Sequence, residues 1–190
     1  MRSAIVGLLG VALAATAVPT TAVAAPHLES AVVVDVGAPR TVQAATTGEH
    51  RLAVLVNRVR ARKGLPQLRY SADISNRADP WARLLGRPRF SGRLAHDPDF
   101  FTDIRRACRV AASGAENVAA RQDRAMPRRS TTARRAARGL LRQYLNSPPH
   151  RANLLDPAAT HFGVATVMRT RSPGGVYVAN VLRFARASSC

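Results

Sequence analysis

The chain has 190 residues, with 29 basic and 11 acidic side chains and a formal net charge of +18. This length predicts one domain, and this charge predicts a salt-dependent attraction to polyanions. Aromatic residues make up only 5% of the chain, and no nucleic-acid-binding motif is visible, so the composition argues against nucleic acid as a partner.

The first 25 residues have the pattern of a secretory signal peptide. Arg2 supplies a positive charge, an apolar stretch runs from Ile5 to Val18, and small residues at Ala22 to Ala25 offer a cleavage site. The apolar stretch is too short to span a bilayer comfortably. We therefore expect a secreted protein with no transmembrane segment in its mature chain, and an uncleaved anchor is the alternative. Outside the cell, the polyanions that it meets are anionic lipids and envelope polymers.

Residues 26–47 are small, polar and proline-containing, and we expect a flexible linker here. The folded domain is then expected over residues 48–190. Its first helix is expected from about Thr47 to Gly64, because apolar residues recur on one face at helical spacing. These residues are Leu52, Leu55, Val56 and Val59.

A second helix is expected from Ser71 to Leu85, where Pro80 either starts a new helical turn or kinks the helix. Glycines and prolines predict a loop from Gly86 to about Phe100, and "FFTDIRRAC" predicts a short helix after it. The stretch "SGAENVAA" is too short to assign by periodicity. The segment from Arg121 to Thr132 is expected to be a basic, flexible loop.

The clearest helix is expected from Thr132 to Leu145, with alanine, leucine and tyrosine on one face and arginines opposite. Two segments rich in valine and aromatic residues follow, "HFGVATVMRT" and "GVYVANVLRFA", and "RSPGG" between them supplies the turn of a hairpin. His161, which starts the first of these strands, is expected to be exposed. Helices followed by a late antiparallel sheet predict an α+β domain.

The chain has two cysteines, Cys108 and Cys190. An even number in an exported protein favours a disulfide bond between them, which would join the last residue to the body of the domain. Two unpaired thiols are the alternative.

Three segments in one order resemble a known family. They are "NRVRARKGLPQLRYSADI" from Asn57, "AENVAA" with a lone His96 about twenty residues before it, and "YLNSPPHRANLLDPAATHFGVAT" from Tyr144 to Thr166. Together they resemble the bacterial branch of the CAP superfamily, which includes cysteine-rich secretory proteins, antigen 5 and pathogenesis-related proteins. The resemblance covers the chain from about residue 48 to its end. It implies an exported α-β-α sandwich, with a central antiparallel sheet flanked by helices.

The resemblance also implies a cleft lined by two histidines and two glutamates, which bind a divalent metal such as zinc in some members. His96, Glu116 and His150 match three of these four groups. The fourth, a glutamate on the helix before the second histidine, has no match, because Gln143 and Asn146 occupy that neighbourhood. A metal is therefore possible at these three residues but is not required.

Three further residues are expected to support the cleft. Asn117 and Asn153 are expected to tie loop backbones together through their amides. Arg151 either contacts an anionic ligand at the rim or forms an ion pair with Asp156 or another acid. We expect both cysteines to be committed to the disulfide, and no catalytic nucleophile is assigned.

The function predicted from these residues is a monomeric, secreted binding module for a lipid, a small amphiphile or an anionic envelope component. The incomplete set of acids favours this interpretation over catalysis. A divalent-metal-dependent hydrolase that uses His96, Glu116 and His150 is one alternative. The other is a secreted structural or defence-related protein that acts through its surface.

Overall fold

A computed structural model describes residues 47–87, 94–111, 113–124, 129–171 and 175–190. They form five helices and four strands: α1 (Thr47–Arg62), β1 (Arg69–Tyr70), α2 (Ala72–Leu85), α3 (Phe100–Ala107), β2 (Ser113–Arg124), α4 (Arg129–Leu145), α5 (Pro148–Leu154), β3 (His161–Arg171) and β4 (Gly175–Arg186). The predicted signal peptide (1–25), nearly all of the predicted linker (26–47) and most of the "RSPGG" turn lie outside the described residues.

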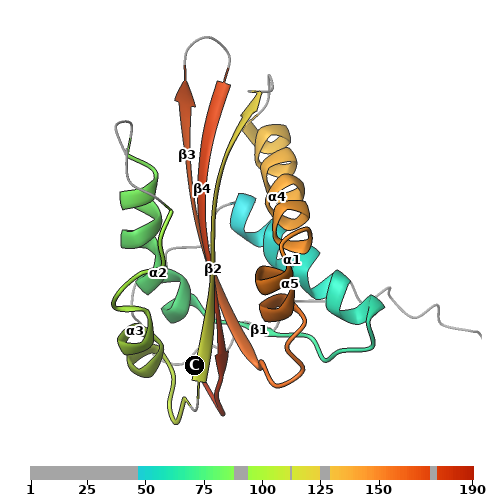
Figure 1. Ribbon diagram of the computed structural model, residues 1–190, viewed down its shortest axis with the longest axis vertical. Coiled ribbons are helices and arrows are strands. Elements are labelled where there is room, and N and C mark those ends of the chain that lie inside the picture. Colours follow the sequence, from blue (N-terminus) through green and yellow to red (C-terminus); the bar gives the residue numbers. More distant parts are fainter. Residues whose placement is uncertain (1–46, 88–93, 112, 125–128, 172–174) are drawn as a thin grey trace, which may run out of the picture. The chain divides into compact units, whose positions relative to one another are not determined.

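The four strands form one sheet in the order β1-β3-β4-β2. β3 and β4 are the predicted antiparallel hairpin, and β2 pairs antiparallel with the other side of β4. The two-residue strand β1 runs parallel to β3, so the sheet is mixed, although its three long strands are antiparallel as expected. Helices α2 and α3 cover one face of the sheet, and α1, α4 and α5 cover the other (Figure 1). The predicted α+β sandwich is confirmed.

Apolar side chains pack on both faces of the sheet, and the central strand β4 is buried on both sides. Val178, Leu182 and Phe184 pack in the cluster that α1 and α4 close, whereas Ala179 and Val181 pack in the cluster that α2 closes. Successive residues of a strand point to opposite faces of the sheet. A strand that is covered on both faces therefore shows the nearly continuous apolar sequence seen here.

β2 was not predicted, and the structure corrects two expectations around it. The strand begins in the unassigned "SGAENVAA" stretch and extends through Arg124. α4 begins at Arg129, so the predicted loop from Arg121 to Thr132 is wrong at both ends. β2 has few of the β-branched residues that mark strands. Pairing with β4 along all twelve residues specifies it instead.

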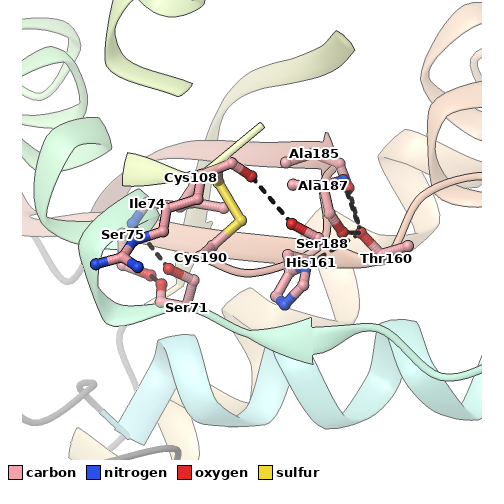
Figure 2. The surroundings of a disulfide bond; sticks show 11 residues. Ser71, Ile74, Ser75, Cys108, Thr160, His161, Ala185, Ala187, Ser188 and Cys190 are labelled. Carbon is pink, nitrogen blue, oxygen red and sulfur yellow. Dashed lines mark hydrogen bonds between the residues drawn. A yellow bond between two sulfur atoms is a disulfide. The ribbon is translucent and has the colours of Figure 1, made fainter. Parts of the chain in front are cut away.

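The predicted disulfide between Cys108 and Cys190 is present (Figure 2). It connects residues 82 positions apart and joins the end of α3 to the last residue of the chain. Next to it, the Arg109 N–H donates a hydrogen bond to the Ser189 carbonyl over 3.0 Å. The carboxyl-terminal segment is thus held by both a covalent bond and backbone pairing.

The expectation that His161 is exposed is wrong. Its side chain is buried at the start of β3, with 5% of its surface exposed, and Nδ1 lies 3.0 Å from the Thr160 hydroxyl oxygen (Figure 2). Burial, followed by the charge of Arg69, lowers the pKa of this imidazole below 6.5.

No helix in the described part of the chain is long and apolar enough to cross a membrane.

Candidate functional site

Glu116 lies on β2 and is almost completely buried, with 4% of its surface exposed. One carboxylate oxygen, Oε1, lies 3.0 Å from His96 Nδ1 and accepts a hydrogen bond of 3.0 Å from the Asp97 N–H. The other, Oε2, accepts a hydrogen bond of 2.9 Å from Arg183 Nε. The structure thus brings His96 and Glu116 together as predicted, and both carboxylate oxygens already have donors.

Arg183, which was not predicted to matter, is the centre of this side of the site. Its guanidinium is fully buried on β4 and pairs with Glu116, with Asp103 over 3.0 Å and with Asp97. It also lies over the ring of Phe100, 5.6 Å from the ring centroid. A signal was present in the sequence, because Arg183 stands between the apolar Leu182 and Phe184 in a largely apolar strand.

Asn117 follows Glu116 in β2 and points to the opposite face of the sheet. Its Nδ2 donates a hydrogen bond of 3.0 Å to the His150 carbonyl, and its Oδ1 accepts one of 2.8 Å from Asn153 Nδ2. Two amides therefore fix α5 against β2. Since β2 is the edge strand of the sheet, the segments carrying His96 and His150 attach to it from opposite faces.

The ring of His150 packs edge-on against Tyr144, with their centroids 5.4 Å apart. The Tyr144 hydroxyl in turn donates a hydrogen bond of 2.6 Å to Asn180 Oδ1. Burial, and then repulsion by the charge of His96, lower the pKa of His150 below 6.5. His150 Nδ1 is buried and has no hydrogen-bond partner among the described residues.

The side chains of Gln143 and Arg151 form no hydrogen bond or ion pair with either of these two histidines within the described part of the chain. Gln143, on the helix where the family carries a second glutamate, donates to the Ala120 carbonyl over 3.4 Å. Arg151 is exposed and forms no ion pair with another described residue. The partner of Asp156 is Arg186, over 2.9 Å, so the predicted pair between Arg151 and Asp156 is not formed.

The described arrangement does not fit a divalent metal. A metal site needs several converging ligands with free lone pairs, but both oxygens of Glu116 already accept hydrogen bonds, one of them from the cationic Arg183. Among the described residues, no group of three histidine, cysteine, aspartate or glutamate side chains could hold a metal ion. The possible metal at His96, Glu116 and His150 remains a prediction that rests on the resemblance alone.

A groove of about 620 Å³ lies beside the Asn117–Asn153 pair, between α5 and the ends of β2 and β4. Its size is typical of a small-molecule site. Small and apolar side chains dominate its lining, which comprises Ser113, Gly114, Ala115, Ala152, Asn153, Leu155, Asp156, Pro157, Ala159, Phe184, Ala185 and Arg186. Sequence reasoning missed this groove, because its residues come from three segments with no motif in common.

The charged residues that line the groove are Arg186 and Asp156, which form an ion pair. Arg186 Nε donates to Asp156 Oδ2 over 2.9 Å, and half of the arginine side chain is exposed. Burial raises the pKa of Asp156, but hydrogen bonds from Arg186 and the Ala158 N–H, and the charges of Arg186 and Arg60, lower it by more. The carboxylate is thus ionised, and its bond orients the guanidinium of Arg186.

Three long antiparallel strands between two layers of helices define the class of this protein as an α-β-α sandwich. A model described as the cysteine-rich secretory protein family, CAP, matches residues 54–181, which is more than half of the chain. The chain belongs to the CAP family, as the resemblance predicted.

Two solved structures of bacterial proteins are similar to this chain, and the first has a TM-score above 0.5, which shows the shared fold. An extracellular protein containing an SCP domain from Bacillus anthracis matches with 22% identity and a TM-score of 0.54, over 79% of this chain and 45% of that chain. A cysteine-rich secretory protein from Staphylococcus aureus matches with 20% identity and a TM-score of 0.49, over 78% and 42%. This chain thus spans less than half the length of either protein. No curated protein matches.

Proposed function

We propose that this chain is a secreted binding module, and that its groove holds a small amphiphile with an anionic head. The observation that carries the proposal is the lining of the groove, where apolar side chains lie next to the half-exposed guanidinium of Arg186, which Asp156 holds in place. The partly exposed Ala115 and Leu155 offer the apolar surface that an alkyl chain needs. Arg186 offers a guanidinium, whose fork geometry suits a carboxylate or a phosphate.

Binding is favoured over hydrolysis because the only carboxylate among the predicted site residues is already held by neighbouring donors. Glu116, the candidate among the predicted residues, is buried and accepts hydrogen bonds at both oxygens. A general base must be able to reach and accept a proton of its substrate. Secretion is supported by the amino-terminal sequence pattern and by the CAP relative from Bacillus anthracis, which is described as extracellular.

The proposal is tested by titrating the mature protein with decanoate and with decanol in a calorimeter. We expect saturable binding of decanoate. Arg186→Gln is expected to weaken decanoate binding about tenfold, since a charge-assisted hydrogen bond contributes about 1.5–3 kcal/mol, and to leave decanol binding unchanged. Ala115→Phe, which fills the groove, is expected to weaken both ligands.

The matched control is Arg169→Gln. Arg169 is exposed and lies near the other end of the β3–β4 hairpin, opposite Tyr177. It removes the same charge without touching the groove. Two results would overturn the proposal: decanoate fails to bind the wild-type protein, or Ala115→Phe binds it as tightly as the wild type does.

A further inference from the structure

The solvent-facing side of α4 consists largely of arginine. Its other side packs into the core through Ala133, Ala137, Leu140 and Tyr144. The exposed side carries Arg134, Arg135, Arg138 and Arg142, which we call the arginine face. No acidic residue occurs anywhere in this seventeen-residue helix.

Three of these arginines recur every four residues and so lie one above another along the helix. Arg134, Arg138 and Arg142 are about 6 Å apart along the axis. Within the described part of the chain, none of the three forms an ion pair or a side-chain hydrogen bond. Stacked like charges destabilise a helix by about 0.2–0.5 kcal/mol per pair. Residues that conflict with local stability in this way are candidates for a role in binding.

Another arginine, Arg121 of the neighbouring strand β2, lies against α4. A Cβ atom added at Gly139 would lie 2.0 Å from Arg121 Nη1, so the glycine makes room for the guanidinium of Arg121 against the helix. Asp123 fixes that guanidinium through two hydrogen bonds of 2.9 and 2.7 Å. Gly139, which weakens α4 by up to about 1 kcal/mol relative to alanine, thereby leaves room for the Arg121–Asp123 pair between β2 and the helix.

We propose that the arginine face docks a linear phosphodiester polymer of the cell envelope, such as a poly(glycerol phosphate) chain. Each repeat unit of such an unbranched polymer carries one negatively charged phosphate, so consecutive phosphates can contact consecutive arginines. In an extended acidic polypeptide, every second carboxylate lies on the same side, about 6.6–6.8 Å from the next, so polyglutamate is included in the test as the competing occupant. An anionic membrane fits less well, because the apolar side chains of α4 face the core and leave no anchor for a bilayer.

This surface is separate from the groove, and the two proposals stand independently. The arginine face is on the exposed side of α4, whereas the groove is lined by β2, α5, β4 and the segment after α5. Decanoate binding therefore reports on the groove, and polymer binding reports on α4.

The test measures binding of the mature protein to fluorescent poly(glycerol phosphate) by anisotropy at several salt concentrations. The variant is Arg134→Gln/Arg138→Gln/Arg142→Gln, because glutamine preserves helix propensity. The control is Arg105→Gln/Arg106→Gln/Arg109→Gln, which removes the same charge from exposed positions on and after α3, across the sheet from α4 (Figure 1). Circular dichroism checks that both variants are folded.

We expect the α4 variant to bind the polymer at least tenfold more weakly. The slope of log affinity against log salt concentration should fall in magnitude by about two, because three phosphate contacts of about 0.7 each are lost. The α3 control is expected to change affinity less than twofold. Equal losses in the two variants would overturn the proposal, because they would show that net charge alone acts. Equally tight binding of polyglutamate, or binding of phosphatidylglycerol vesicles without binding of the soluble polymer, would also overturn it.

Discussion

Arg183 is a buried cation that forms ion pairs with three acidic side chains. Its guanidinium binds Glu116, Asp103 and Asp97, which come from β2, α3 and the segment before α3. A buried arginine is costly unless it is paired and hydrogen-bonded. The same contacts explain why Glu116 is held in place as a structural acceptor. One residue on β4 thus organises the side of the site that carries His96.

Arg183→Ala should strongly destabilise the protein. It would leave three acids around an empty space, and removal of one partner from a buried ion pair costs about 3–5 kcal/mol. Urea unfolding followed by circular dichroism measures this change, with the exposed Arg169→Ala as the control. A loss of free energy of unfolding below about 1 kcal/mol for Arg183→Ala would contradict the assigned role.

The buried His161 and the half-buried His150 should make stability depend on pH near neutrality. Burial and neighbouring positive charge lower the pKa of both His150 and His161 below 6.5. Below that pH the unfolded chain binds more protons than the folded protein, so the free energy of unfolding falls as pH drops through about 6.5 and is fully restored above it. Urea unfolding at pH 8 and pH 5.5 measures the loss.

The matched protein for this comparison is the double variant His150→Gln/His161→Gln. This variant lacks both imidazoles whose pKa values are lowered. It is therefore expected to lose less free energy of unfolding than the wild type when the pH falls from 8 to 5.5. If both proteins show the same loss, the histidines are not the titrating groups, and the assigned environments of the two rings are wrong.

Among the elements, β2 has the largest influence on the site. It is an edge strand, and its consecutive residues Glu116 and Asn117 point to opposite faces, where they hold the segments carrying His96 and His150. Its first residues, Ser113 to Ala115, also line the groove. A short stretch of one strand therefore positions both the predicted site residues and the binding groove.

The disulfide bond also holds distant elements together, because it connects the end of α3 to the segment after β4. Cys108→Ala/Cys190→Ala is expected to lower the free energy of unfolding by up to about 4.5 kcal/mol, since the bond closes a long loop in the unfolded chain. Urea unfolding of the variant and of the oxidised wild type measures this difference. Equal midpoints and slopes for the two proteins would show that the bond contributes nothing to stability.

For the whole molecule, the sequence predicted the elements that have a clear period. α1 and α2, the hairpin and the disulfide follow from apolar spacing and cysteine count. β2 could not be predicted, because pairing with β4 rather than local propensity specifies it. Arg183 and the groove depend on residues that are distant in sequence. Periodicity reports which face of an element is buried and carries no information about which residues meet across the core.

The central claim is that the groove between α5 and the ends of β2 and β4 binds a small anionic amphiphile. The most direct measurement is a nuclear magnetic resonance titration of the labelled mature protein with decanoate. We expect saturable chemical-shift changes at groove residues such as Ala115, Asn153 and Arg186. We expect Ala115→Phe to abolish these changes. Shifts confined to other surfaces, or no saturable shift at all, would contradict it.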